Sequence, residues 1–302
     1  MSTDDTSDPA VRVRDLRKDY GHFHAVDGIS FDIERGETFA LLGPNGAGKS
    51  TTVEILEGYR ERTSGEVSVL GQDPRHAGLA WKARLGIVLQ QTGESGNVSV
   101  REQLAHFASL YPNPRDVDEV IAAVGLEEKA KTRIKSLSGG QRRRVDVALG
   151  IVGRPELLFL DEPTTGFDPE ARRQFWELIR SLSREGTTIV LTTHYLDEAA
   201  QLSDRAAVIA GGRLIEMGPV HELGPAEARI PIVRWRDASG LHEERTETPA
   251  ARVAALVAAH GELPELEVIR PGLEDIYLDL VATAEAETRA QTPTQEQTRV
   301  DA

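Results

Sequence analysis

The residues with the clearest chemical meaning lie between an apolar run and a helix-like run near the start of the chain. They read Gly43-Pro44-Asn45-Gly46-Ala47-Gly48-Lys49-Ser50-Thr51. Glycines at this spacing let the backbone curl so that successive N–H groups point at an anion. Lys49 then reaches the β- and γ-phosphates of a nucleotide, and the Ser50 hydroxyl takes a position on Mg²⁺. Residues 38–42 predict a strand before this loop and residues 53–57 a helix after it, so we expect nucleotide binding.

Two carboxylates follow a second apolar run. Asp161 and Glu162 come directly after residues 157–160, which predict a central parallel strand next to the strand of the phosphate loop. Asp161 can hold Mg²⁺ through water, and Glu162 can polarise an attacking water. Phosphoryl transfer mostly needs positioning and charge compensation, so this pair suits hydrolysis of the bound nucleotide.

Single polar side chains end two more strand-like runs. Gln90, with Gln91 beside it, follows residues 85–89, and His194 follows residues 187–193. Taken alone, such a glutamine is more typical of a solvated loop and such a histidine of a structural residue. Ligands bind at the carboxyl ends of strands in α/β sheets. Together with Asp161 and Glu162, which also follow a strand, His194 becomes a candidate sensor of the γ-phosphate.

A helical insertion is predicted after residue 97, because apolar residues of 98–135 recur at helical spacing. It leads to a segment of small residues that opens a new helix. That segment can be a second anion-binding helix N-terminus, or it can be a capped helix without a ligand, and the sequence leaves both open. It reads Leu137-Ser138-Gly139-Gly140-Gln141.

The remaining segments predict the layers around these groups. Residues 11–16 alternate as a half-exposed strand does, and Tyr20 follows them. Its ring fits stacking on a nucleobase and packing at a strand end equally well. A hairpin signature closes the predicted core domain. The expected division is 1–10 as a disordered tail, 11–222 as the core domain, 228–282 as a small α+β domain and 283–302 as a disordered tail.

Composition excludes several classes of function. The chain has 302 residues, a net charge of −14 and no cysteine. An acidic chain does not suit a partner held by phosphate neutralisation, so no nucleic-acid partner is expected. Without cysteine, disulfides and thiolate chemistry are excluded. The polar, acidic start lacks the features of a signal peptide, and no apolar run reaches the ~20 residues that span a bilayer.

Together these groups occur in the order and rough spacing of the ATP-binding cassette (ABC) ATPases, which residues 10–222 resemble. The most specific element is the segment 137–141 ahead of a strand that ends in Asp161 and Glu162. The resemblance implies an α/β fold with a P-loop NTPase core, an antiparallel β subdomain and a helical signature subdomain at about 97–150. A small C-terminal α+β appendage follows.

The resemblance also implies roles for single residues. Glu162 would be the general base, His194 the switch histidine and Lys49 a catalytic cation on ATP. Tyr20 would stack on adenine. Gln90, preferred over its neighbour because it directly ends the strand, would sense Mg²⁺ and contact the transmembrane partner. The implied cofactors are ATP and Mg²⁺, and the implied metal ligands are Ser50, Gln90 and Asp161.

Half of the site is implied to act on a second copy. The signature 137–141 would bind the γ-phosphate held by the opposite subunit, and Asp168 would lie in the loop across the dimer interface. Phe167 stands where the family usually has leucine, and since it is apolar we expect packing rather than chemistry to change. One chain carries one phosphate loop and one signature, so two copies must pair head to tail as a homodimer.

The C-terminal segment narrows the resemblance. It reads Pro271-Gly272-Leu273-Glu274-Asp275-Ile276-Tyr277-Leu278 and is similar to a motif of ATPase subunits of drug-resistance and antibiotic exporters with separate membrane subunits. This implies a subunit that energises efflux through a permease, peripheral on the cytoplasmic face of the cell membrane. The alternative is a non-transport cassette ATPase acting on ribosomes or DNA, which a single cassette and an acidic charge disfavour.

Overall fold

The computed structural model describes residues 8–89, 97–193, 195–237 and 239–291. The chain forms two compact units, Met1–Met217 and Gly218–Ala302. The structural division therefore lies slightly before residue 222, where the sequence places the end of the core domain.

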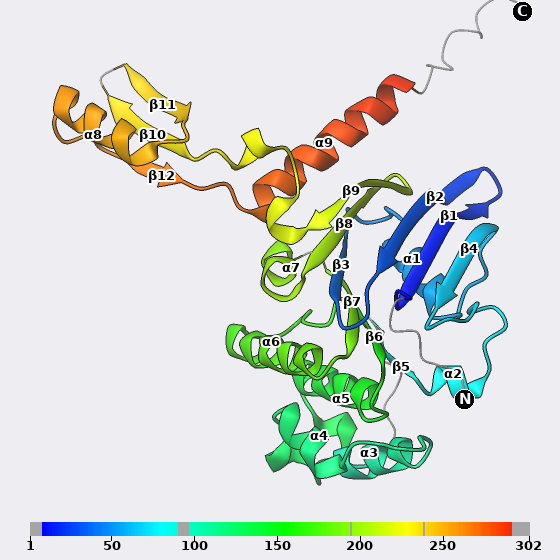
Figure 1. The fold of residues 1–302 in the computed structure, drawn as a ribbon. Coiled ribbons are helices and arrows are strands. Elements are labelled where there is room, and N and C mark those ends of the chain that lie inside the picture. The colour runs from blue at the N-terminus through cyan, green and yellow to red at the C-terminus, as the bar shows by residue number, and fades with distance from the viewer. Residues whose placement is uncertain (1–7, 90–96, 194, 238, 292–302) are drawn as a thin grey trace, which may run out of the picture. The chain divides into compact units, whose positions relative to one another are not determined.

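A six-stranded sheet forms the centre of the first unit (Figure 1). Its strands pair in parallel from β5 to β8, and β3 and β7 are buried along their whole length, as is typical of parallel strands with both faces covered. The order is β5 (Leu85–Val88), β6 (Leu157–Asp161), β7 (Thr188–Thr192), β3 (Thr38–Leu42), β8 (Arg205–Ala210) and β9 (Arg213–Pro219).

The strand order corrects one expectation. Strand β6, which ends in Asp161, is not next to the phosphate-loop strand β3, because β7 lies between them. Thr192 of β7 pairs with Asp161 on one side and with Leu41 of β3 on the other. The three carboxyl ends therefore still meet at one edge of the sheet, where ligands of α/β folds bind.

A three-stranded antiparallel sheet adds the β layer that the alternating residues predict. It has the order β2 (Phe23–Ile33), β1 (Val11–Tyr20) and β4 (Ser64–Val69). Both sheets contribute to one apolar core, in which the rings of Phe31 from β2 and Phe39 from β3 stack with centroids 5.7 Å apart. Helix α1 (Lys49–Leu56) and the short helix α2 (Leu79–Lys82) complete this region.

Helices form the part of the first unit where the sequence predicts the insertion (Figure 1). Apolar residues at helical spacing, Val100, Leu104, Val120 and Ile121 among them, are buried in one cluster. The elements are α3 (Val100–Ala108), α4 (Val117–Ala123), the 3-10 turns η1 (Glu127–Lys129) and η2 (Ile134–Ser136), and α5 (Gly139–Ile151). Helices α6 (Pro169–Arg184) and α7 (Leu196–Leu202) follow β6 and β7.

The second unit has both strands and helices. A small core of Val233, Trp235, Leu256 and Leu263 holds its sheet against α8. The elements are η3 (Val220–Glu222), η4 (Ala226–Arg229), β10 (Ile232–Asp237), β11 (Gly240–Arg245), α8 (Pro249–His260), β12 (Glu267–Ile269) and α9 (Leu273–Gln291), with the strand order β11-β10-β12.

Helix α9 extends beyond the residue at which the sequence predicts the start of the C-terminal tail. It continues to Gln291, past residue 283, where the sequence predicts disorder. Residues 283–291 comprise three Ala, two Glu, two Thr, one Arg and one Gln. All but the two threonines are strong helix formers, so a helix already started at Leu273 can propagate through them. Among the residues that the structure describes, no helix has the length and apolarity to cross a membrane.

Candidate functional site

The phosphate loop joins β3 to α1 with a backbone that only glycine fits. Gly48 has φ +103°, and a Cβ placed there would lie 2.3 Å from the carbonyl oxygen of Ala25. At Gly43, φ is +158° and a Cβ would lie 2.2 Å from the carbonyl oxygen of Ile209. Gly48 is also the N-cap of α1 and offers no side chain to its amides. The helix therefore presents free backbone N–H groups, as an anion site requires.

Lys49 is held inside this loop. Its Nζ donates to the carbonyl oxygens of Gly43 at 2.7 Å and Pro44 at 3.0 Å, and its side chain is buried. Burial lowers the pKa of Lys49, while the charges of Glu162 and Asp161 act in the opposite direction. The predicted phosphate-binding cation Lys49 thus lies in the electrostatic field of the predicted base Glu162 and of the predicted Mg²⁺ ligand Asp161.

The two carboxylates leave β6 at the edge where β7 also ends. The Thr192 hydroxyl donates to Oδ1 of Asp161, and the backbone N–H of Glu162 donates to the carbonyl oxygen of Thr192 at 3.0 Å. Glu162 has φ +46°, a left-handed conformation that is uncommon for residues other than glycine. Such conformations persist only where surrounding contacts hold them, and they concentrate at functional sites.

The segment 137–141 begins α5 with a complete capping box. Ser138 Oγ accepts from the N–H of Gln141 at 3.2 Å, and Gln141 Oε1 accepts from the N–H of Ser138 at 3.0 Å. A Cβ placed on Gly140 would lie 3.7 Å from the carbonyl oxygen of Gly166, so the start of α5 approaches the turn before α6. Leu137 is buried and anchors the segment in the helical cluster.

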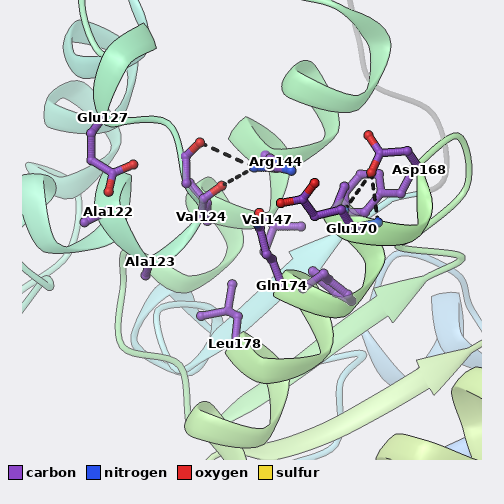
Figure 2. Close-up of a pocket in the computed structure, with 14 residues that line it drawn as sticks. Ala122, Ala123, Val124, Glu127, Arg144, Val147, Asp168, Glu170, Gln174 and Leu178 are labelled. Atoms are coloured by element: carbon purple, nitrogen blue, oxygen red, sulfur yellow. Dashed lines mark hydrogen bonds between the residues drawn. The ribbon is translucent and has the colours of Figure 1, made fainter.

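Asp168 begins α6 at this turn. Its Oδ1 accepts from the N–H groups of Glu170 at 3.0 Å and Ala171 at 2.8 Å. Residues of α4, α5 and α6 line a cavity of about 590 Å³. Figure 2 shows Asp168 at one end of the group of residues that line it. No residue of the phosphate loop lines that cavity. Phe167 is buried with its ring edge-on to Phe175, which agrees with a packing role.

Tyr20 stands at the end of β1 with 44% of its surface exposed. The ammonium of Lys18 lies 5.0 Å from the ring centroid, and the guanidinium of Arg60 lies 5.7 Å from it and donates to the Tyr20 hydroxyl. An accessible ring suits stacking on a base, and cations over its face stabilise the ring without one. Stacking of Tyr20 on adenine stays a prediction.

Three predicted residues lie outside the part of the chain that the structure describes. These are Gln90, Gln91 and His194. The described residues that precede them are Leu89, which follows β5, and Thr193, which follows β7. Their roles remain predictions.

Sequence reasoning assigned no role to two buried charged residues beside the site. Arg143 of α5 is buried, and its guanidinium reaches the carboxyl end of β6, where it donates to the carbonyl oxygen of Asp161. Glu198 of α7 is fully buried, accepts from Nε1 of Trp176 at 3.4 Å, and burial raises its pKa. For Arg143 a signal exists, because it lies four and seven residues before Val147 and Gly150, which are buried on the same helix.

Comparisons with known proteins agree with this geometry. The sequence model described as ABC transporter matches residues 26–165. The Nod factor export ATP-binding protein I of Ralstonia nicotianae is 40% identical over 85% of this chain and 80% of its own length. The daunorubicin resistance ATP-binding protein DrrA3 of Streptomyces coeruleorubidus is 34% identical over 91% of this chain and 96% of its own.

A solved structure supports the same fold. The dimeric ATP-binding cassette MJ0796, bound to ADP and Pi, superposes with a TM-score of 0.63 and 23% identity, over 69% of this chain and 98% of that one. The predicted α/β phosphate-loop fold is therefore confirmed.

Proposed function

Because the chain belongs to the ABC transporter family as an ATP-hydrolysing subunit, we propose that two copies pair head to tail and power an exporter. Each copy supplies a phosphate loop to one nucleotide and a signature segment to the other. The observation that supports this most is the common edge of β3, β7 and β6, which gathers Lys49, Asp161 and Glu162. The dimer of the MJ0796 cassette is a precedent for the pairing.

In this proposal the residues of one copy hold ATP before hydrolysis. The amides at the start of α1 and the ammonium of Lys49 bind its phosphates. Oxygen ligands suit Mg²⁺, and the Ser50 hydroxyl, the Asp161 carboxylate and the Gln90 amide are the oxygen donors that would hold it. Bound Mg²⁺ would neutralise charge that develops on the phosphate oxygens.

Glu162 then accepts a proton from the attacking water. Its carboxylate follows the strand that ends in Asp161, and its backbone is tied to Thr192 at the end of β7. His194, two residues beyond Thr192 along the chain, would contact the γ-phosphate. The Ser138 hydroxyl and the N–H groups of Gly139 and Gly140 complete the pocket of the opposite copy.

The cargo belongs to the same proposal. The two relatives are named for daunorubicin resistance and Nod factor export, and we propose efflux of a drug, antibiotic or other hydrophobic compound. A separate permease would hold the chain at the inner face of the membrane and would select the cargo. Both relatives bear the names of export or resistance proteins, so they offer no support for the alternative of a ribosome- or DNA-acting ATPase.

Substitution of Glu162 tests the catalytic part of the proposal. Glu162→Gln should lower phosphate release by about 10²–10⁴-fold, because the amide cannot accept the proton of water. ATP affinity should be retained, and with Mg²⁺ and ATP the variant should accumulate at twice the mass of one chain. The control is Glu177→Gln, an exposed carboxylate of α6 paired with Arg180. Full turnover by Glu162→Gln would remove Glu162 from the role of base.

A further inference from the structure

Arg143 joins three segments of the first unit through one buried guanidinium. Only 6% of its surface is exposed. Its Nε donates to the carbonyl oxygen of Pro163 at 3.1 Å, and its Nη2 to those of Asp161 at 2.6 Å and Glu162 at 3.2 Å. Its Nη1 donates to the carbonyl oxygen of Leu89, directly after β5. Four backbone acceptors thus converge on one side chain from α5.

One of these acceptors is the backbone carbonyl oxygen of Glu162, the predicted base. Glu162 has a left-handed φ of +46°, which costs free energy and needs contacts to maintain it. The N–H of Glu162 is held by Thr192 of β7, whereas its carbonyl oxygen is held by Arg143 of α5. Two elements therefore fix the peptide groups on either side of its Cα, and so the direction in which its carboxylate leaves the chain.

The helix that carries Arg143 also carries the signature. Ser138 is the N-cap of α5, and Arg143 lies in the second turn of the same helix. A helix is stiff over such a distance, so a displacement of its first turn moves Arg143 with it. A nucleotide held by the opposite copy would thereby influence the backbone conformation of Glu162. This connection rests on the proposed function, which places the signature against that nucleotide.

The burial of the Arg143 guanidinium costs free energy, which is unfavourable for a side chain that serves only packing. Burial lowers the pKa of Arg143, and within the described part of the chain its hydrogen bonds go to backbone carbonyl oxygens rather than to a carboxylate. Asp146 lies three residues later on α5, with a buried Oδ2 that has no hydrogen-bond partner in the described part of the chain. The carboxylates of Asp146, Asp161 and Glu162 attract the guanidinium charge, but its burial is still the larger effect on its pKa, so an apolar residue would serve simple packing better.

We propose that Arg143 is a positioning residue for Glu162, which it holds in its strained backbone conformation from the signature helix. It has no contact with substrate of its own. Its effect on hydrolysis must therefore pass through Glu162, and binding of ATP in the phosphate loop should not depend on it.

Two substitutions and a double mutant test this assignment in the full chain. Arg143→Gln should lower kcat by about 10- to 100-fold, since small displacements of a catalytic group have effects of that size. The Kd for ATP should change by less than about 2-fold. Arg143→Lys keeps the charge but has fewer donors, and it should recover part of kcat. The matched control is Arg101→Gln, an exposed arginine of α3 paired with Asp118, which should retain wild-type kcat.

The double mutant separates positioning from general damage. In the Glu162→Gln background, Arg143→Gln should lower the residual rate by less than about 2-fold, because the carboxylate that Arg143 is proposed to position is already absent. A further loss as large as in the wild type would overturn the proposal, as would wild-type kcat in Arg143→Gln or an equal loss of ATP affinity. If Arg143→Gln does not fold, Arg143→Lys decides: a lowered kcat at unchanged Kd supports the proposal and an unchanged kcat refutes it.

The same measurements keep this proposal apart from the proposed function. The role of the base is judged by Glu162→Gln alone, whatever Arg143 does. If Glu162→Gln hydrolyses ATP normally, the assignment of the base fails. If Glu162→Gln is inactive and Arg143→Gln is not, only the positioning role fails.

Discussion

Glu57 is a buried carboxyl group at the C-terminal end of α1, and no part of the proposed mechanism uses it. Its side chain is 7% exposed. Burial raises its pKa to about 8, with smaller contributions from the negative charges of Asp161 and Glu54. At neutral pH the folded protein therefore keeps a proton on Glu57 that the unfolded chain releases.

This difference predicts how stability depends on pH. The folded pKa is raised above the ordinary 4.5, so the stability linked to Glu57 is fully present below pH 4.5 and is lost as pH rises to about 8. The slope is at most about 1.4 kcal/mol per pH unit. Glu57→Gln should remove this contribution, so its Tm should fall less than the wild-type Tm between pH 6 and pH 8.5.

The control for Glu57 is Glu61→Gln, which replaces an exposed carboxylate a short way along the chain. It should lose Tm with pH as the wild type does. Identical pH dependence of Tm in the wild type and Glu57→Gln would show that this carboxyl group carries no such linkage. Thermal unfolding followed by circular dichroism, without nucleotide, is sufficient for all three proteins.

Two helices of the first unit begin with the same capping arrangement. Ser99 and Glu102 form the box that starts α3, and Ser138 and Gln141 form the box that starts α5. In both, the serine hydroxyl accepts from a backbone N–H three residues later, and the side chain at that position accepts from the serine N–H. Local sequence alone explains both helix starts.

Substitution of the two N-cap serines distinguishes helix capping from ligand binding. Ser99→Ala and Ser138→Ala should each lower the free energy of unfolding by about 1 kcal/mol, since each removes one cap. Only Ser138→Ala should also lower ATP turnover, because the proposed function places that hydroxyl on the nucleotide of the opposite copy. Urea unfolding and phosphate release measure the two effects. Equal turnover in both variants would make the start of α5 an ordinary cap.

At the scale of the whole molecule, the proposed site is divided between copies. The phosphate loop, Asp161 and Glu162 meet at one sheet edge, while the signature begins a helix whose first turn faces the turn before α6. Because the signature and the phosphate loop of one chain would serve different nucleotides, hydrolysis should require association of the first units of two chains. The second unit has its own small core around Trp235, and Arg234 of its sheet pairs with Glu243 and Glu267.

A dilution series tests this division. The rate of ATP hydrolysis per chain should rise with protein concentration and level off when the dimer is saturated, because each copy completes the pocket of the other. Mass measured by light scattering at the same concentrations identifies the species present. A rate per chain that stays constant down to a monomeric solution would refute the divided site.

The amino-acid sequence by itself determined the class of fold, the phosphate loop and the helical insertion. These depend on local causes: glycine stereochemistry at residues 43 and 48, strand-like apolar runs, and helical spacing of residues such as Leu104 and Ile121. The disordered tail predicted from residue 283 stays a prediction, and in the structure α9 continues to Gln291.

Only the tertiary structure decided which strands are neighbours and where buried charges point. Strand β7 separates β3 from β6 because the chain returns to the middle of the sheet, which no local pattern encodes. Arg143 appeared as one of three consecutive arginines, and its inward direction follows from packing of α5 against β5 and the carbonyl oxygens beyond β6. The strained φ of Glu162 has the same origin, since contacts from two distant elements hold it.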